Sequence, residues 1–303
     1  MYYNGEYALK DYFNFLGFKI NTKKFLMATG VYALIVFILV LIDLLFLEVS
    51  WYGFLMGSAF LLAVVVSSEL MPLRGLKKDL PYDLIWRIFP LSIIGARLAF
   101  VANFPDQYKT FYDVIAVWNG GLSIYGGVIG GAVGLVICCL IKKVNPICAM
   151  DCVVPVLILG QAIGRWGNFF NVEVYGLEIT NKALQWFPFG IKNEYGVWHL
   201  ATFFYESMLN LIGFFILLLL VRKTKQKGLV ASVYLMYYGF IRFFLEGIRE
   251  SKFIMYIPGT QIAWSALVSI IMFAIGVGGF IASLIVYRVK RRANNNSETT
   301  NNL

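Results

Sequence analysis

The chain has 303 residues, of which 59% are hydrophobic and 14% charged, with a formal net charge of +9. A soluble domain would be nearer half apolar, so this composition excludes a water-soluble globular fold. We expect an all-α polytopic membrane protein. In such a protein, the positions of the charged residues along the chain are more informative than the sign of the net charge.

Apolar segments of about 18 or more residues predict roughly eight transmembrane helices. In chain order they cover residues 25–48, 51–71, 84–103, 120–141, 151–172, 202–221, 229–248 and 261–287. One set of alternate connections carries most of the 26 Lys and Arg residues. This positive-inside pattern predicts that both termini are cytoplasmic. We expect no cleavable signal peptide, and a disordered polar tail after the last span.

The four cysteines lie in or beside apolar segments, without the paired spacing of a zinc site or a disulfide framework. A structural role is therefore predicted for Cys138, Cys139, Cys148 and Cys152.

The glycine-rich segment 118–134 contains two series of glycines at four-residue spacing. Gly126, Gly130 and Gly134 form the longer one, which predicts close packing against another helix. The preceding Gly120 and Gly121 favour a turn. We expect Tyr125 near the outer end of this helix, where its hydroxyl could face a lipid headgroup.

The segment 160–176, with sequence GQAIGRWGNFFNVEVYG, places polar side chains at the end of an apolar span. Arg165 is the most informative, because a guanidinium in hydrocarbon costs a few kcal/mol and usually has a partner or a task. The partner could be an anion, and the anion available at that depth is a lipid phosphate. Buried ion pairs with intramembrane acids are the structural alternative.

A second polar series lies in the seventh span, where Tyr238, Arg242, Glu246 and Arg249 follow at steps of four, four and three. These residues share one helix face. Either Arg242 and Glu246 simply neutralise each other, or Glu246 holds the Arg242 guanidinium and leaves its other donors for a phosphate.

The longest connection, residues 173–201, is too short for a domain and is expected to form a small outer lobe. It contains His199, the single histidine of the chain. A lone histidine is more often structural than catalytic, and it cannot make a zinc site. No metal or other cofactor is expected.

These motifs together resemble the prolipoprotein diacylglyceryl transferase family. GRWGNFFNVEVYG, at Gly164–Gly176, fills every fixed position of the family signature G-R-x-G-N-F-x-N-x-E-x-x-G. Further matching pieces, in the family's order, are WYG at Trp51–Gly53, GARL at Gly95–Leu98, GGLSIYGG at Gly120–Gly127, HxxxxxYE at His199–Glu206 and YGxxRxxxE at Tyr238–Glu246. The resemblance implies a seven-span core at 49–287, preceded by an additional segment and helix at 1–48 and followed by a tail at 288–303.

The resemblance implies that the chain transfers a diacylglyceryl group from phosphatidylglycerol to the lipobox cysteine of prolipoproteins, releasing glycerol phosphate. It makes Arg165 and Arg242 candidate phosphate-binding and catalytic residues, together with Tyr125 and Glu246. The candidate substrate-binding residues are Arg165, Asn168, Glu173, Gly176, Tyr52, Tyr238, Arg97, His199 and Glu206. The expected partners are phosphatidylglycerol, lipobox signal peptides and membrane lipids, with no nucleic acid, and the expected location is the bacterial plasma membrane with the active site toward the outer leaflet.

Tyr125 departs from some family members, which carry a histidine at that place. A phenol has an ordinary pKa near 10, against about 6.5 for imidazole, so it is a poor base at neutral pH. We therefore expect Tyr125 to orient the thiol rather than deprotonate it.

Two other functions remain to be distinguished. A lipid-binding transporter or flippase would use the same arginines but would release no glycerol phosphate. An intramembrane protease is disfavoured, because HExxH, GxSxG and paired GxGD-type aspartates are not found.

Overall fold

The computed structural model describes residues 12–15, 18–44, 50–257 and 259–301, with side chains described over 20–41, 50–257 and 259–289. Within these residues, eight helices are long and apolar enough to cross a membrane. They are Thr22–Leu41, Trp51–Arg74, Leu80–Asn103, Ile124–Ile141, Pro146–Phe170, Thr202–Lys223, Leu229–Glu246 and Trp264–Val289. The expected all-α polytopic fold is confirmed. The predicted features at residues 1–11 and 45–49 lie outside the described residues.

The chain divides into two compact units, Met1–Trp51 and Tyr52–Leu303. The first unit contains an antiparallel hairpin of β1 (Tyr12–Phe15) and β2 (Phe18–Asn21), followed by helix α1 (Thr22–Leu44). Asn21 accepts a hydrogen bond from the Lys24 amide through Oδ1, at 2.9 Å, which satisfies a free amide in the first turn of α1. The sequence did not predict the hairpin.

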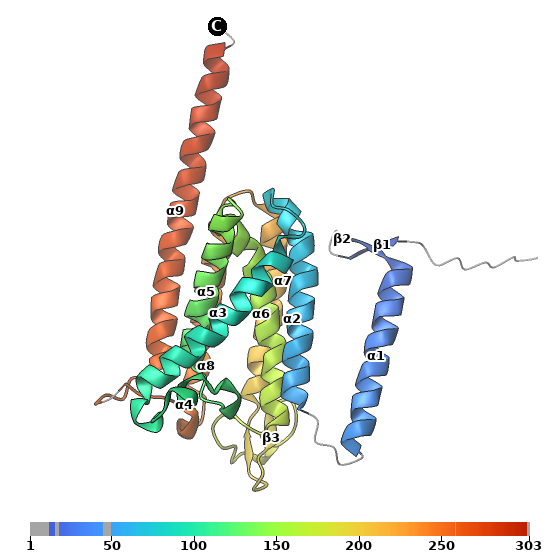
Figure 1. The fold of residues 1–303 in the computed structure, drawn as a ribbon, viewed down its shortest axis with the longest axis vertical. Coiled ribbons are helices and arrows are strands. Elements are labelled where there is room, and N and C mark those ends of the chain that lie inside the picture. Colours follow the sequence, from blue (N-terminus) through green and yellow to red (C-terminus); the bar gives the residue numbers. More distant parts are fainter. Residues whose placement is uncertain (1–11, 16–17, 45–49, 258, 302–303) are drawn as a thin grey trace, which may run out of the picture. The chain divides into compact units, whose positions relative to one another are not determined.

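The second unit contains the helices that carry the site (Figure 1). The long ones are α2 (Trp51–Leu70), α3 (Leu80–Asn103), α5 (Ile124–Ile141), α6 (Pro146–Phe170), α7 (Thr202–Lys223), α8 (Leu229–Glu246) and α9 (Trp264–Asn301). Short elements connect them: η1 (Met71–Arg74), η2 (Pro105–Gln107), α4 (Phe111–Ile115), η3 (Val117–Asn119), η4 (Lys182–Leu184), β3 (Gly190–Lys192), β4 (Trp198–Leu200) and η5 (Ser251–Phe253).

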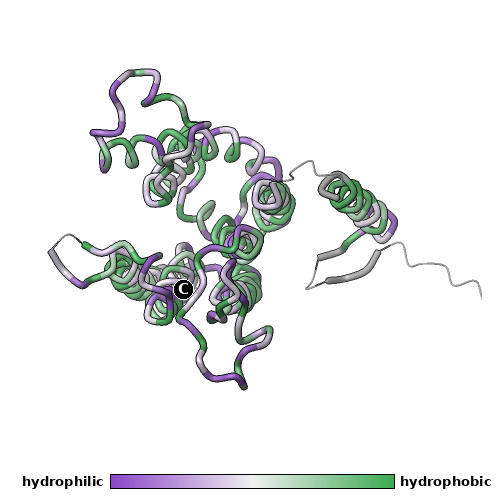
Figure 2. The backbone as a smooth tube through the Cα atoms, turned by 90° about the horizontal axis from the view of Figure 1, so that it is seen from below, coloured by the Kyte–Doolittle hydropathy of each residue, from purple (hydrophilic) through white to green (hydrophobic). Residues whose placement is uncertain are grey.

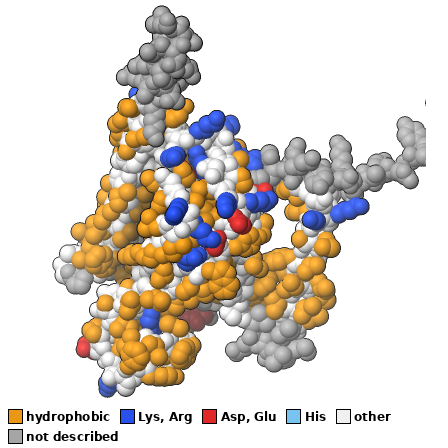
Figure 3. Space-filling view, turned by 45° about the horizontal axis from the view of Figure 1, so that its top comes forward, with side chains coloured by type: hydrophobic (Ala, Val, Ile, Leu, Met, Phe, Trp, Pro, Cys, Tyr) orange, Lys and Arg blue, Asp and Glu red, His pale blue; other side chains and the backbone are white. Residues whose placement is uncertain are grey.

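The two ends of this unit differ in character. Viewed from the end that carries α4 and β3, hydrophilic segments gather in the connections around apolar helices (Figure 2). We call residues 173–201 the lobe, and this end the lobe end. The opposite, basic end shows Lys and Arg side chains above largely hydrophobic flanks (Figure 3). Its exposed lysines are Lys77, Lys78, Lys142, Lys143, Lys223, Lys225 and Lys227.

The expected disorder of the tail at 288–303 stays a prediction, and helix α9 continues to Asn301. The reason is local: no Gly or Pro follows Gly279 to terminate the helix that begins in the last span.

The crossing of α3 and α5 confirms the prediction of close glycine packing. A Cβ placed on Gly126 would lie 2.2 Å from the Gly95 carbonyl oxygen, and one on Gly130 would lie 2.1 Å from that of Leu91. The predicted turn is also confirmed, because Gly120 and Gly121 have φ of +82° and +73°.

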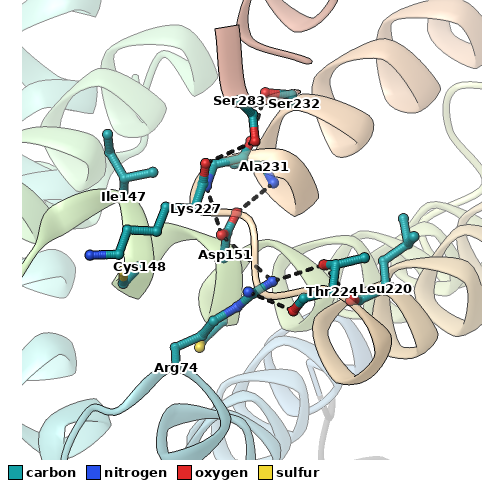
Figure 4. Close-up of polar contacts among 12 residues, drawn as sticks. Arg74, Ile147, Cys148, Asp151, Leu220, Thr224, Lys227, Ala231, Ser232 and Ser283 are labelled. Carbon is teal, nitrogen blue, oxygen red and sulfur yellow. Dashed lines mark hydrogen bonds and ion pairs between the residues drawn. The ribbon is translucent and has the colours of Figure 1, made fainter. Parts of the chain in front are cut away.

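At the basic end, the buried carboxylate of Asp151 on α6 connects several elements of the fold (Figure 4). It accepts hydrogen bonds from the amides of Gly228 and Ala231, at 2.8 and 3.0 Å, and so caps the first turn of α8. Arg74 lies 3.7 Å from the same carboxylate and donates to the Thr224 carbonyl at 2.8 Å. This network connects η1, α6 and the turn between α7 and α8.

The four cysteines are free and buried. Cys152 donates to the Leu70 carbonyl across the contact between α6 and α2, at 3.5 Å. This packing agrees with the structural role expected from their spacing.

Candidate functional site

Charged side chains from α6, α7 and α8 meet near the lobe end of the second unit. Arg165 on α6 contacts Glu206 on α7, with 2.7 Å between Nη2 and Oε1. The Glu206 side chain is only 3% exposed, and Tyr238 on α8 donates to the same oxygen at 3.4 Å. A buried carboxylate needs such partners, because its desolvation is otherwise costly.

Glu206 also links the two arginines that the sequence singled out. Its Oε2 lies 3.9 Å from Nη1 of Arg242. Arg165 and Arg242 therefore flank one carboxylate, although they lie on different helices. The sequence predicted both arginines and Glu206 as site residues, but not that Glu206 lies between them.

The predicted pairing of Arg242 with Glu246 is confirmed, with 2.7 Å between Nη2 and Oε2. Arg249 lies 3.6 Å from the same oxygen, and Ser265 at the start of α9 donates to the other one. Arg242 Nη1 makes no hydrogen bond among the described residues. Nη2 is therefore held by Glu246, whereas Nη1 is buried, faces Glu206 at 3.9 Å and keeps unsatisfied donors.

The cluster of Arg165, Arg242, Arg249, Glu206 and Glu246 carries one more positive than negative charge when all five groups are ionised. Burial, followed by repulsion from Arg242, lowers the pKa of Arg249 to about 10, which still leaves it charged at neutral pH. A partly buried site with excess positive charge and a free guanidinium donor can bind an oxyanion.

The signature segment continues the polar network beyond α6. Arg165 donates to Asn168 at 3.3 Å, and Asn168 donates to Glu173 at 3.0 Å. Val172 and Val174, on either side of Glu173, have φ of +49° and +58°. Branched side chains rarely adopt this backbone conformation, so the segment is strained at the place where it turns back toward the cluster.

Gly176 ends the signature in a crowded position. Its amide donates to the Leu200 carbonyl at 2.9 Å, and it forms an isolated bridge with Arg249. A Cβ there would lie 2.7 Å from the Ile248 carbonyl oxygen and 2.8 Å from Thr202. Glycine is needed because backbones of the lobe and of the segment after α8 approach so closely.

Two predicted tyrosines lie beside this cluster. Tyr125, at the start of α5, is 38% exposed and within electrostatic range of Arg242, Glu246 and Arg249. The Tyr52 ring, on α2, packs against Gly167, where a Cβ would lie 2.2 Å from the ring. Both tyrosines therefore belong to the same end of the bundle as the arginines.

Arg97 was expected to contact the substrate, but its guanidinium contacts the protein backbone instead. Its guanidinium makes five hydrogen bonds, all to backbone carbonyls, at 2.5–3.2 Å. The acceptors belong to Asp113, Val114, Ala116, Gly120 and Gly121. An arginine has five N–H donors, so none remains for a ligand. Sequence spacing could not show this, because the acceptors are main-chain atoms of a loop.

A cavity of about 290 Å³ lies beside Arg97, with Phe100, Tyr108 and Gly121 among its lining residues. It is bounded by the loop that Arg97 holds. The pair of Arg165 and Arg242 does not line it.

His199, also predicted as a substrate-binding residue, is buried on β4 within the lobe. Its ring is 4.4 Å from that of Tyr175, measured between centroids. It contacts Gly176, Asn193 and Glu250 rather than the arginine pair. Asn193 and Ser265 were missed by the sequence analysis, because single polar residues in loops carry no periodic signal.

Comparisons with known proteins identify the family of this chain. A family model described as prolipoprotein diacylglyceryl transferase matches residues 39–282. A protein of Streptococcus agalactiae named phosphatidylglycerol–prolipoprotein diacylglyceryl transferase is 39% identical over 247 residues, covering 80% of this chain and 92% of its own. Proteins of the same name from Streptococcus uberis and Streptococcus pyogenes are 40% identical over 235 residues and 37% identical over 252 residues. These cover 76% and 81% of this chain, and 88% and 92% of their own.

The matched range includes every residue of the arginine cluster, the signature and the lobe. It begins within α1, ten residues before the predicted start of the core at residue 49, so that boundary stays a prediction. The chain therefore belongs to the prolipoprotein diacylglyceryl transferase family.

Proposed function

We propose that this protein transfers the diacylglyceryl group of phosphatidylglycerol to the cysteine thiol of a prolipoprotein lipobox. The observation that carries the proposal is the pair of arginines from α6 and α8, joined through Glu206 and retaining a free donor on Arg242. Family membership supplies the reaction, and the cluster supplies a binding site of suitable charge.

The reaction is a nucleophilic substitution at the glyceryl C3 carbon. The cysteine sulfur forms a bond to C3 while the bond from C3 to the phosphodiester oxygen breaks. The leaving group departs as glycerol phosphate, and the thiol proton is released to solvent. Negative charge grows on that oxygen in the transition state. Arg165 and Arg242 stabilise this charge more than they stabilise the intact lipid, because they are already oriented and partly shielded from water.

The carboxylates position the arginines. Glu206 and Glu246 accept hydrogen bonds only, so direct contact with a phosphate would be repulsive. Glu206 instead orients Arg165 and faces Arg242, while Glu246 holds the other side of Arg242. The thiol approaches Tyr125, whose hydroxyl orients it, and the positive field of the cluster favours the thiolate.

The remaining predicted residues act at a distance from the reacting atoms. Asn168 and Glu173 continue the hydrogen-bond chain from Arg165. The Tyr52 ring packs against α6 at Gly167. Arg97 holds the loop that precedes Tyr125, and Tyr238 supports Glu206. This assignment replaces direct substrate contact by Arg97 with a positioning role.

The basic end faces the cytoplasm in this proposal, and the lobe end faces outward, in a bacterial plasma membrane. Phosphatidylglycerol enters from the outer leaflet, and the lipobox of a signal peptide presents its cysteine at the same depth. Cysteine substitutions at Lys225 and Lys182, which lie at the basic and lobe ends, test this orientation. Only the second should react with an impermeant maleimide in intact cells.

The decisive experiment separates a transferase from a lipid transporter. Purified protein receives phosphatidylglycerol labelled in its headgroup glycerol, together with a lipobox peptide. We expect glycerol phosphate and thioether-linked peptide in equal amounts. A peptide with Ser in place of its Cys should release nothing, and Arg87→Lys, at the basic end, serves as a matched control with normal activity. Movement of lipid between leaflets without release of glycerol phosphate would support the transporter instead.

A further inference from the structure

The imidazole of His199 connects the lobe to the signature segment through both ring nitrogens. Nδ1 lies 3.0 Å from the Gly176 carbonyl oxygen, and Nε2 lies 3.2 Å from Nδ2 of Asn193. A carbonyl can only accept a hydrogen bond, so Nδ1 carries the proton in this contact. Nε2 must then accept from the Asn193 amide, which requires the neutral imidazole.

The orientation of the Asn193 amide is fixed by its own backbone contacts. Its Oδ1 accepts hydrogen bonds from the amides of Tyr195 and Val197, at 2.9 and 3.0 Å. These two bonds close the turn between β3 and β4. Rotation of the amide would break both, so Nδ2 stays directed toward His199.

The charged groups around His199 oppose one another. Glu250, in the segment after α8, has Oε2 3.7 Å from Nδ1 and favours a protonated ring. Lys252 lies 3.7 Å from the same Glu250 and hydrogen-bonds to Tyr175, whose ring lies beside the imidazole. Glu178 pairs with His199 through the backbone, and its side chain is exposed.

The contact reaches the arginine cluster through Gly176. This residue is bridged to Arg249, and its amide donates to Leu200, the residue after His199. Arg249 in turn lies 3.6 Å from Glu246, which holds Arg242. Gly176 therefore connects the His199 contact to the backbone beside Arg249.

We infer that Asn193 and neutral His199 form a positioning relay that fixes Gly176 against the end of α8. Protonation of Nε2 sets two donors face to face, because Asn193 cannot turn, so the imidazole loses its anchor to the turn between β3 and β4 while Nδ1 still donates to Gly176. The packing of the lobe end thereby depends on the charge of this one imidazole. The inference rests on the proposed function for its effect on catalysis, but not for its structural content.

The single histidine of the chain allows a direct structural test. Protein labelled with ¹⁵N-histidine, and purified through a tag without histidine, gives ring signals from His199 alone. At pH 8 the nitrogen shifts should show the neutral tautomer with the proton on Nδ1. A neutral ring with the proton on Nε2, or a charged ring at that pH, would overturn the relay.

Asn193→Asp is the most informative variant, because an aspartate at this position favours a protonated His199 ring instead of a neutral one. The carboxylate still accepts from Tyr195 and Val197, but it now accepts from a protonated Nε2 as well. The ¹⁵N shifts should show a charged ring at neutral pH. Asn181→Asp is the matched control: Asn181 is exposed in the same lobe and accepts from the Ala183 amide, and its change should leave the His199 signals as in wild type.

The pH profile of transfer connects the relay to catalysis. Loss of the peptide thiolate lowers kcat in every variant as the pH falls, so each profile is divided by that of His199→Asn, which cannot titrate and retains a donor toward Gly176. The wild-type ratio should fall about tenfold between pH 7.5 and 5.5, the effect of roughly one hydrogen bond. The ratio for Asn193→Asp should stay constant over that range. A constant wild-type ratio would refute the catalytic part of the inference. Absence of transfer by every protein at every pH would instead reject the proposed function, while the ¹⁵N shifts still decide the relay.

Discussion

Glu206→Gln is the substitution that most directly examines how the site is built. It keeps the size of the side chain but removes the negative charge that Arg165 and Arg242 share, at 2.7 and 3.9 Å. The cluster would then have three guanidinium groups facing one carboxylate. The arginines would repel each other, and Arg165 would lose its closest anionic partner.

The size of the effect follows from burial. The side chains of Arg165, Arg242 and Glu206 are 20%, 12% and 3% exposed, so solvent screens the lost interaction poorly. Removing one member of a buried ion pair typically costs about 3–5 kcal/mol. Because Arg165 retains some contact with water and with Asn168, we expect about 3 kcal/mol of lost stability, at the lower end of that scale. If misplaced arginines weaken the transition state by a similar amount, kcat falls about a hundredfold.

The assay measures kcat and KM for diacylglyceryl transfer together with thermal unfolding in detergent micelles. Glu69→Gln is the matched control, because it removes the same charge from the exposed ion pair with Lys78 at the basic end. It should alter both quantities little. A Glu206→Gln protein with the melting temperature and kcat of wild type, within twofold, would refute the reasoning that this carboxylate organises the arginines.

Four further predictions concern the same end of the bundle and its packing. Arg165→Lys keeps the charge but loses the planar fork, so transfer should fall about a hundredfold; near-normal turnover would exclude planar phosphate recognition. The double variant Glu246→Gln/Arg242→Lys should be little worse than the worse single variant, because the two side chains form one unit at 2.7 Å, and fully multiplicative losses in kcat would show independent roles. Tyr125→Phe should lower kcat about tenfold or less if the hydroxyl only orients the thiol, and a near-inactive variant rescued at high pH would identify the phenolate as the base. Gly130→Ala should lower the melting temperature strongly in detergent, because its Cβ would lie 2.1 Å from a carbonyl oxygen of α3; unchanged melting would mean that the helices separate at little cost.

The arrangement of charges explains how a cationic site can persist among apolar helices. Each guanidinium of the pair is held on one side by a carboxylate, which offsets the cost of burying its charge. The cluster keeps an excess of one positive charge, and the buried Nη1 of Arg242 has no hydrogen-bond partner among the described residues. In the proposed function, both serve the phosphate of the lipid. Such a site is oriented before substrate arrives, so little reorganisation is required during the reaction.

The sequence by itself determined the spans, the candidate polar face of α8 and the glycine face of α5. These features depend on spacing along one helix, and the helical repeat converts spacing directly into position. The pairing of Arg242 with Glu246, four residues apart, is of this kind. The family signature likewise lies in one continuous segment, so Arg165, Asn168 and Glu173 could be selected without a structure.

Only the tertiary structure decided which groups from different helices share a partner. Glu206 could have paired with any nearby cation, and its position between Arg165 and Arg242 results from the packing of α6, α7 and α8. The five backbone acceptors of Arg97 were equally hidden, because carbonyl groups have no sequence signature. Local spacing fixes what a helix presents, whereas contacts between helices depend on the whole bundle, which is why the sequence predicted the members of the site but not their partners.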